Sequence, residues 1–156
     1  MVKALEAGDK APAFSVDTDG GGHAALKDFK GEPLVLYFYP KDDTAGCTSE
    51  ASGFSAKRKQ FDNAGARVLG ISKDTVAAHD RFKAKHKLAI ALGSDADGHA
   101  CEDYGVWKEK SMYGRKYMGI ERSTFLIGAD GRIARVWRKV KIPGHVEEVL
   151  EAVKAL

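Results

Sequence analysis

The chain has 156 residues, of which 44% are hydrophobic and 30% are charged, and its formal net charge is +3. A chain of this length can bury a core of its own, so we predict one domain over residues 1–156. Its basic runs are short and lie among acidic residues, which argues against a nucleic-acid-binding surface. No apolar run is long enough to span a membrane, and the polar N-terminal segment lacks the pattern of a signal peptide.

The two cysteines, Cys47 and Cys101, can form one disulfide at most. There is no Cys-x-x-Cys pair and no Cys/His cluster with zinc spacing, so we expect no metal and no other cofactor. We expect a reducing, cytoplasmic location, where cysteines are more often catalytic than cross-linked.

The first predicted elements are β-strands. The glycines at 20–22 separate two short apolar segments and are typical of a hairpin turn. Residues 34–39 form a continuous apolar run, which indicates a strand buried on both faces of a sheet. The N-terminal part therefore predicts a β-hairpin followed by a central strand.

The middle of the chain alternates between helix and strand. A helix is predicted from about residue 47 to residue 63, because Ala51, Phe54 and Phe61 share one face and Gly65 is a natural end. The elements predicted after it are a strand at 67–71, a helix capped by Asp74 that runs to about His86, a weaker strand at 88–92 and a short helix at 99–104.

The last part of the chain predicts a second hairpin and a closing helix. The Asp130-Gly131 step between the strand-like segments 123–127 and 132–137 is a hairpin signal. Apolar residues spaced as i, i+3, i+4 and i+7 predict an amphipathic helix, and they are Val146, Val149, Leu150 and Val153. The fold class is therefore α/β, with a central mixed sheet flanked by helices, and the order of elements fits a thioredoxin-like fold.

Cys47 follows the strand at 34–39 and the strand-breaking Pro40, at the expected opening of a helix. The thiolate is the reactive form of cysteine, and the N-terminus of a helix favours negative charge. This placement makes Cys47 a candidate nucleophile. The alternative is a small buried core residue, because free cysteine is often buried.

Two blocks of sequence carry a resemblance to a known family. Residues 37–51 read Tyr-Phe-Tyr-Pro-Lys-Asp-Asp-Thr-Ala-Gly-Cys-Thr-Ser-Glu-Ala, which contains Pro-x-x-x-Thr-x-x-Cys, and the second block is Gly-Ile-Glu-Arg-Ser-Thr-Phe-Leu-Ile at 119–127. The chain resembles the peroxiredoxins over nearly its whole length, and in particular the bacterioferritin comigratory protein (BCP or PrxQ) branch. The resemblance implies a thiol peroxidase that reduces hydrogen peroxide and small organic hydroperoxides.

The resemblance also implies roles for single residues. Cys47 would be the peroxidatic cysteine, and its amide and the Thr44 hydroxyl would bind the peroxide. Arg122 would hold its guanidinium against both the sulfur and the peroxide oxygens, and Pro40 would shield the site from water. Taken alone, Thr44 would be a helix cap, Pro40 a strand terminator and Arg122 a solvated charge.

Four further residues lie close to Cys47 in the sequence. Glu50, one turn into the helix, would orient Arg122, and Gly46 would help to orient the substrate. Asp42 and Asp43 would disfavour a charged sulfur beside them. They could instead lie at the helix N-terminus with their side chains turned away, and the sequence leaves both possibilities open.

The usual second cysteine of the family is absent. Relatives carry a resolving cysteine either five residues after the peroxidatic one, where this chain has Ser52, or on the next helix, where it has Lys83. Cys101 is expected to be a buried structural thiol, and the alternative is a resolving cysteine that requires a large movement. Ser52 could also be an engineered replacement.

These absences predict a one-cysteine cycle, in which an external thiol reduces oxidised Cys47. The expected partners are a hydroperoxide and a reductant such as thioredoxin, glutaredoxin or a low-molecular thiol, and the expected state is a monomer. A competing interpretation is a redox sensor or holdase that signals through oxidised Cys47 without turnover. A dithiol oxidoreductase is excluded at this position because no second thiol lies near Cys47.

Overall fold

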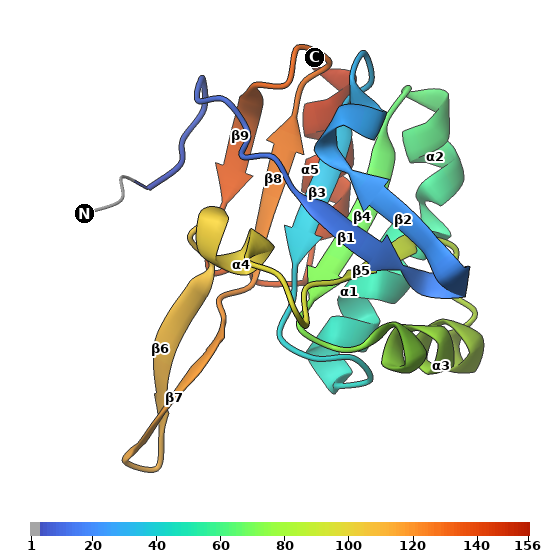
Figure 1. Cartoon of the computed structure of the whole chain (residues 1–156). Helices are drawn as coiled ribbons and strands as arrows, with labels where there is room; N and C mark the ends of the chain where they lie inside the picture. Colours follow the sequence, from blue (N-terminus) through green and yellow to red (C-terminus); the bar gives the residue numbers. More distant parts are fainter. Residues whose placement is uncertain (1–3) are drawn as a thin grey trace.

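The computed structural model describes residues 4–156, which fold around a seven-stranded mixed sheet (Figure 1). The first half of the chain contains β1 (Ser15–Thr18), the 3₁₀ helix η1 (Asp19–Gly21), β2 (Gly22–Ala25), the 3₁₀ helix η2 (Leu26–Phe29), β3 (Leu34–Phe38), α1 (Ala45–Ala56), α2 (Arg58–Asn63) and β4 (Arg67–Ser72). The second half contains α3 (Val76–His86), β5 (Ala91–Ser94), α4 (Ala100–Asp103), β6 (Trp107–Met112), β7 (Arg115–Ile120), β8 (Ser123–Ile127), β9 (Ile133–Trp137) and α5 (His145–Lys154).

The strand order in the large sheet is β2-β1-β5-β4-β3-β8-β9, which places β3 near its middle. Strand β3 pairs in parallel with β4, where Leu36 lies opposite Leu69, and antiparallel with β8, where Leu36 lies opposite Phe125. All five residues of β3 are buried, as the continuous apolar run predicted. A strand covered on both faces gives the chain that follows it a rigid starting point.

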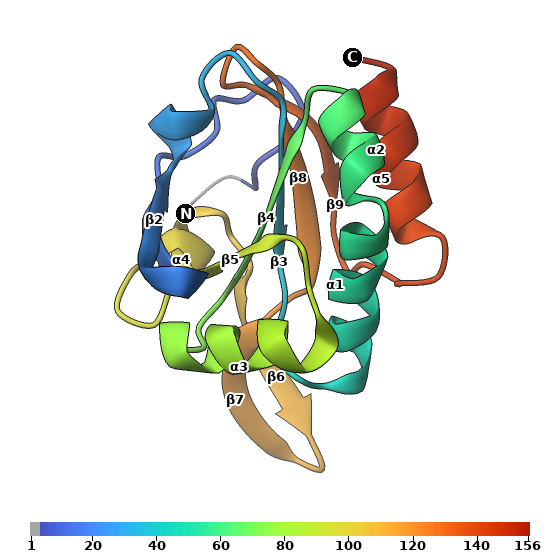
Figure 2. The same ribbon diagram turned by 90° about the vertical axis from the view of Figure 1, so that its right-hand side faces the viewer.

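The sheet separates two layers of hydrophobic core. Side chains alternate along β3, so Val35 and Tyr37 enter one core cluster while Leu36 and Phe38 enter the other. Helices α1, α2 and α5 lie on one side of the sheet and α4 lies on the other (Figure 2). Helix α3 joins the first layer through Phe82.

The structure confirms the main predicted elements. The mixed sheet, the helices on both sides and the N-terminal hairpin of β1 and β2 are present. Gly20 and Gly21 both adopt the left-handed backbone conformation that this turn requires. Strands β8 and β9 form the second hairpin, and α5 buries Val149 and its apolar neighbours.

Three predicted details are wrong. The helix expected at 47–63 is interrupted at Lys57, where a second helix, α2, begins. Phe61 of α2 packs against Phe54 of α1, with ring centroids 5.8 Å apart. The strand expected at 88–92 is instead β5 at Ala91–Ser94, because a left-handed Lys87 ends α3 and the chain needs several residues to reach the sheet.

The third correction concerns the cap of α3. Thr75, not Asp74, caps this helix, and the Thr75 hydroxyl accepts a hydrogen bond from the Ala78 amide. The Asp74 carboxylate accepts bonds from the Ser72 hydroxyl and the Asp42 amide instead. A residue type suited to capping is therefore used to hold the loop after β3.

The hairpin of β6 and β7 was not predicted from the sequence. It forms a separate two-stranded sheet that projects from the body of the molecule (Figure 1). Its two turn residues, Tyr113 and Gly114, both have positive φ angles. Neither strand has the apolar alternation of a half-buried strand, because most of the hairpin is exposed.

Within residues 4–156, no helix is long and apolar enough to cross a lipid bilayer. The first three residues of the segment that was judged not to be a signal peptide lie outside the described residues.

Candidate active site

Cys47 lies in the first turn of α1, close to the point where the chain leaves β3. Thr44 is the N-cap residue, and its carbonyl accepts a bond from the Thr48 amide at 2.8 Å. The Cys47 side chain is 1% exposed and belongs to the same core layer as Tyr37. The sulfur is thus buried at the N-terminal end of a helix, where backbone N–H groups favour negative charge.

Arg122 connects the sulfur to a buried carboxylate. It lies between the end of β7 and the start of β8, and its Nη2 donates to Cys47 Sγ at 3.2 Å. Its Nη1 donates to Glu50 Oε1 at 2.7 Å. Burial alone would lower the pKa of Arg122, but Glu50 and Cys47 outweigh burial and raise it. The guanidinium therefore stays positively charged against the sulfur.

Glu50 is completely buried one turn after Cys47. Burial raises the pKa of this carboxyl group from its ordinary value of 4.5 to about 7, although Arg122 acts in the opposite direction. Its Oε2 atom has no hydrogen-bond partner among the described residues. Glu50 is thus in direct contact with Arg122 through its other carboxylate oxygen.

Three more of the predicted site residues, Gly46, Thr44 and Pro40, lie near Cys47 in the sequence. A Cβ atom on Gly46 would lie 3.2 Å from Arg122 Nη2 and 3.1 Å from Ile142 Cδ1, so only glycine leaves full room for the arginine. The Thr44 hydroxyl is exposed and donates to the Lys41 carbonyl at 2.9 Å. Pro40 lies two residues after the end of β3 and is half-buried.

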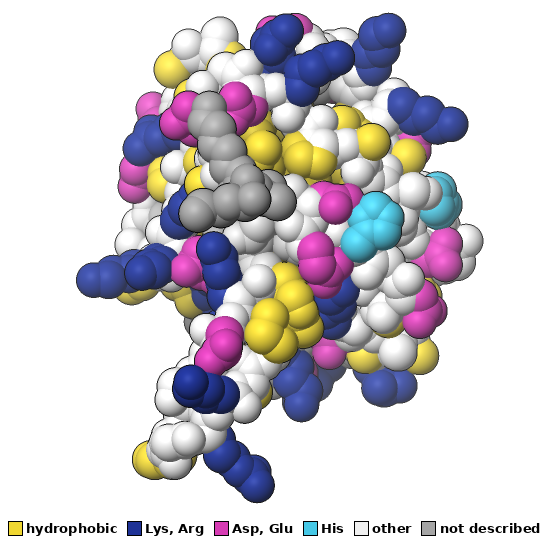
Figure 3. Space-filling model, turned by 60° about the vertical axis from the view of Figure 1, so that its left-hand side comes forward, with side chains coloured by type: hydrophobic (Ala, Val, Ile, Leu, Met, Phe, Trp, Pro, Cys, Tyr) yellow, Lys and Arg dark blue, Asp and Glu magenta, His cyan; other side chains and the backbone are white. Residues whose placement is uncertain are grey.

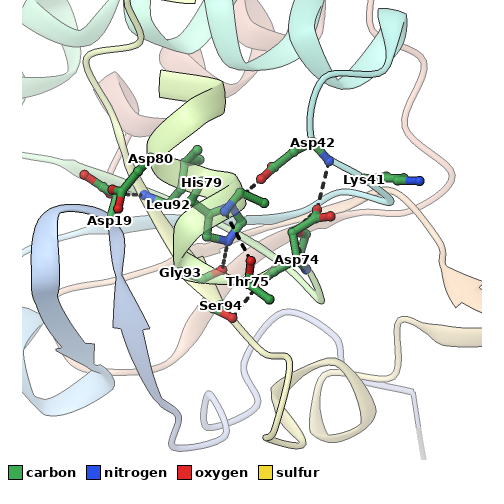
Figure 4. A network of polar contacts seen from close by, with 12 residues as sticks. Asp19, Lys41, Asp42, Asp74, Thr75, His79, Asp80, Leu92, Gly93 and Ser94 are labelled. Atoms are coloured by element: carbon green, nitrogen blue, oxygen red, sulfur yellow. Dashed lines mark hydrogen bonds and ion pairs between the residues drawn. The ribbon is translucent and has the colours of Figure 1, made fainter. Parts of the chain in front are cut away.

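Both acidic residues before Cys47 turn toward α3. Asp42 is buried and accepts a bond from the Tyr39 hydroxyl at 2.6 Å. It also accepts a bond from His79 Nδ1 at 2.6 Å (Figure 4). Asp43 has a left-handed backbone and pairs with Lys85 and His86, each at 2.7 Å. Hydrogen bonds from Lys85 and His86 lower the pKa of Asp43. The negative charges of the loop are thus neutralised by α3.

His79 is a residue that the sequence analysis missed. It is fully buried, and its second ring nitrogen, Nε2, lies 2.9 Å from the Gly93 carbonyl, which can only accept (Figure 4). Burial lowers the pKa of His79, but the bond and charge of Asp42 outweigh it and raise the pKa. The position of His79 three residues before Phe82, on the buried side of α3, was the available signal.

Cys101 lies in the other core layer, across the sheet from Cys47. It is fully buried in α4, in the cluster that contains Phe38 and Tyr104, and its thiol is free. Burial and the nearby Asp95 carboxylate strongly raise the pKa of this thiol. The structure therefore brings together Cys47, Arg122, Glu50 and Gly46, and leaves Cys101 apart from them.

The resemblance implied a resolving cysteine at one of two positions, and this chain has Ser52 and Lys83 there. Ser52 is exposed on α1. Lys83 on α3 pairs with Asp19 at 2.7 Å, and Asp19 also accepts a bond from the Leu92 amide at 2.8 Å. The ion pair fastens α3 to the sheet at the position of the missing cysteine.

Known proteins resemble this chain in sequence along most of its length. A Coxiella burnetii protein named putative peroxiredoxin bcp is 54% identical over 146 residues, which cover 94% of this chain and 97% of the relative. Residues 7–136 match the model of the AhpC/TSA family. The chain belongs to this family of peroxiredoxins. The resemblance stated on the two sequence blocks is thereby confirmed.

Solved structures of peroxiredoxins agree with the fold. A cysteine-to-serine mutant of Xylella fastidiosa PrxQ has a TM-score of 0.92 and 43% identity, and the match covers 99% of this chain and 98% of that one. The bacterioferritin comigratory protein of Xanthomonas campestris, described for its alkyl peroxide reduction activity, has a TM-score of 0.89 and 45% identity over 96% of this chain and 98% of that one. The predicted thioredoxin-like fold is confirmed.

Proposed function

We propose that this peroxiredoxin reduces hydrogen peroxide and organic hydroperoxides through Cys47 and returns to the thiol state with an external thiol. The observation that carries the proposal is the contact between Arg122 Nη2 and Cys47 Sγ at 3.2 Å. The guanidinium does not lose its proton, so it stabilises the thiolate form of Cys47, which is the form that attacks a peroxide. Glu50 holds the other side of that guanidinium and acts as a positioning residue.

In the first half of the cycle, the Cys47 thiolate attacks one peroxide oxygen. The S–O bond forms and the O–O bond breaks, so that the sulfur is oxidised to sulfenic acid and the peroxide is reduced. The second oxygen leaves as alkoxide or hydroxide and takes up a proton to become alcohol or water. Arg122 and the first-turn amides of α1 stabilise the charge on the two oxygens during this step.

Thr44 is proposed to fix the direction of the peroxide. Its hydroxyl hydrogen is used in the bond to the Lys41 carbonyl. The Thr44 oxygen is therefore left as an acceptor, and we propose that it accepts the hydrogen of the hydroperoxide group. Pro40, which carries no N–H group, is proposed to form the wall of the site.

In the second half of the cycle, a thiol attacks the sulfenic sulfur, releases water and forms a mixed disulfide. A second thiol breaks this disulfide and restores Cys47, while the reductant leaves oxidised. An internal partner is disfavoured because Cys101 lies in the opposite core layer and has a strongly raised pKa. The monomeric state, the cytoplasmic location and the identity of the reductant remain predictions.

Peroxide consumption with dithiothreitol as the reductant tests the proposal. We expect Cys47→Ser to abolish turnover and Cys101→Ser, the matched control, to retain most of it. Loss of turnover in Cys101→Ser alone would reverse the assignment. Intact mass after one equivalent of peroxide should show a gain of one oxygen, whereas a loss of two hydrogens would indicate a bond between Cys47 and Cys101.

The same assay separates an enzyme from a redox sensor or holdase. An enzyme consumes peroxide for as long as the thiol lasts. Consumption of one equivalent followed by arrest, with Cys47 still oxidised in the presence of the thiol, would support the sensor instead.

A further inference from the structure

The hairpin of β6 and β7, residues 107–120, carries most of the large hydrophobic side chains that are exposed within residues 4–156. Of the five large apolar residues that are exposed within residues 4–156, four lie on it: Met112, Tyr113, Tyr117 and Met118. The hairpin also has four Lys or Arg residues and one Glu, so its formal charge is +3. The formal charge of the whole chain is also +3, so the rest of the chain is formally neutral.

The surface view shows this hairpin as an arm that stands away from the body, with basic side chains along it (Figure 3). A two-stranded hairpin has little stability of its own in water. Aromatic and methionine side chains that are exposed together are typical of a surface that binds a partner. The arm is therefore a candidate binding surface.

The strand register divides the arm into two faces. Residues that lie directly opposite each other in an antiparallel pair point to the same side. The pairs of Lys110 with Tyr117 and of Met112 with Arg115 therefore share one face, on which Lys108 also lies. We call these five residues the basic face, and it contains no acidic residue. The opposite, mixed face consists of Trp107, Glu109, Ser111, Lys116, Met118 and Ile120.

The basic face looks toward the active site. The Lys110 side chain runs back along the arm, and its Nζ donates to the Ile120 carbonyl, two residues before Arg122. A Cβ atom on Gly119 would lie 3.2 Å from Lys110 Cδ, so the glycine leaves a path for this side chain. Burial and Arg122 lower the pKa of Lys110, while Cys47 acts in the opposite direction.

The mixed face looks the other way. Its Trp107 ring lies under Lys73 Nζ, 5.1 Å from the ring centroid. Lys73 in turn pairs with Asp95, whose carboxylate accepts bonds from the amides of Ala100 and Cys101 at the start of α4. The mixed face is thus directed to the side of the sheet that holds Cys101, and the basic face to the side of Cys47.

We propose that the basic face of the arm is the docking site for a small acidic protein dithiol that reduces oxidised Cys47. The inference rests on the proposed function, because that function requires a thiol from outside the chain. The exposed Lys108 and Arg115 would meet acidic residues of the partner. Met112 and Tyr117 would pack against the apolar rim of its thiol site. The partner's thiolate would then attack the sulfenic sulfur of Cys47.

The length of the arm favours a protein over a small thiol. Arg115 lies five residues from Ile120, which corresponds to about 17 Å along a strand. A tripeptide thiol is at most about 11 Å long, so one that reaches Cys47 cannot also touch the end of the arm. A protein of about 100 residues has a radius of gyration of about 13 Å and can contact both places at once.

A second copy of this chain is a poorer occupant. Two basic faces would bring like charges together, which disfavours their association. Lysine side chains along an exposed strand edge also oppose pairing with another strand. The positive charge of the arm therefore points to an acidic partner.

Matched variants on the two faces test this inference. Arg115→Glu with Tyr117→Ser changes the basic face, and Lys116→Glu with Met118→Ser makes the same kinds of change on the mixed face. We measure KM for thioredoxin and for glutaredoxin in peroxide turnover, with dithiothreitol as a small-thiol reference. The basic-face variant should raise KM for the protein reductant about tenfold and the mixed-face variant less than twofold, with dithiothreitol turnover unchanged in both.

Several outcomes would overturn the inference. Equal effects of the two variants, or no effect of either, would show that the basic face does not recognise the reductant. Turnover with dithiothreitol but with neither protein would exclude a protein dithiol and leave the proposed peroxidase intact. A change in the mass of the particle in sedimentation on altering the basic face would identify a second copy as the occupant. Absence of dithiothreitol turnover in the unaltered protein would contradict the proposed function itself.

Discussion

Replacing Glu50 by glutamine should make the protein more stable at alkaline pH and leave its stability nearly unchanged at acid pH. Burial raises the pKa of Glu50 from 4.5 to about 7 in the folded protein. The folded state therefore disfavours the charged carboxylate. The stability that the neutral group contributes is present below pH 4.5, and it is lost as the pH rises to 7.

The size of the effect follows from the pKa difference. A shift of about 2.5 pKa units corresponds to about 3 kcal/mol, at roughly 1.4 kcal/mol for each unit. Glutamine does not ionise, so Glu50→Gln avoids this loss and can still accept a bond from Arg122. The difference in unfolding free energy between variant and wild type should rise by about 3 kcal/mol between pH 4.5 and pH 7 and stay level above pH 7.

Urea denaturation at half-unit pH steps measures this difference curve. The histidines titrate in both proteins, and their contributions cancel in the subtraction. Glu32→Gln is the control, since Glu32 is exposed and lies in a surface pair with Arg67, and its curve should stay flat within about 0.5 kcal/mol. A curve for Glu50→Gln that falls with pH would refute the reasoning, because it would mean that Arg122 outweighs burial and lowers the pKa.

Two other predictions concern buried polar groups near the site. Tyr37→Phe should raise the unfolding free energy by about 1 kcal/mol, because the buried Tyr37 hydroxyl has no partner among the described residues. Tyr39→Phe should lower the unfolding free energy by about 1–3 kcal/mol, because it removes the bond to Asp42. Equal losses of unfolding free energy in urea denaturation would contradict this prediction. Burial lowers the pKa of His145 to about 4 from 6.5, so stability present above pH 6.5 is lost as the pH falls toward 4, by about 3 kcal/mol. His145→Gln should remove that loss, and identical acid unfolding of the two proteins would disprove it.

The parts of the fold that could be predicted from the sequence are those in which burial determines the residue pattern. Strand β3 is apolar at every position because both of its faces are covered. The arm of β6 and β7 has no such pattern, because solvent reaches both faces and nothing forces alternation. The Tyr113-Gly114 turn was the remaining local signal, and tyrosine at a positive φ is not a usual choice there.

The active site divides in the same way. Cys47, Thr44 and Arg122 could be predicted as site residues because they belong to two short blocks of sequence with a known spacing. The directions of Asp42 and Asp43 depend on His79 and Lys85, which lie more than thirty residues further along the chain. Local sequence carries no information on such a contact, and the turning of both acids toward α3 could only be seen in the structure.

The attachment of the active-site loop to α3 has a consequence for motion. His79, Lys85 and His86 bind the two acids that lie just before α1, and Lys83 binds the helix to η1. The loop and α3 therefore open together, as one cooperative unit, and the opening of either costs the contacts of both. Amide hydrogens in the loop should be as slow to exchange as those of α3. Cys47 follows this loop in the first turn of α1 and is buried, so the contacts with α3 oppose any local unfolding that would expose the sulfur.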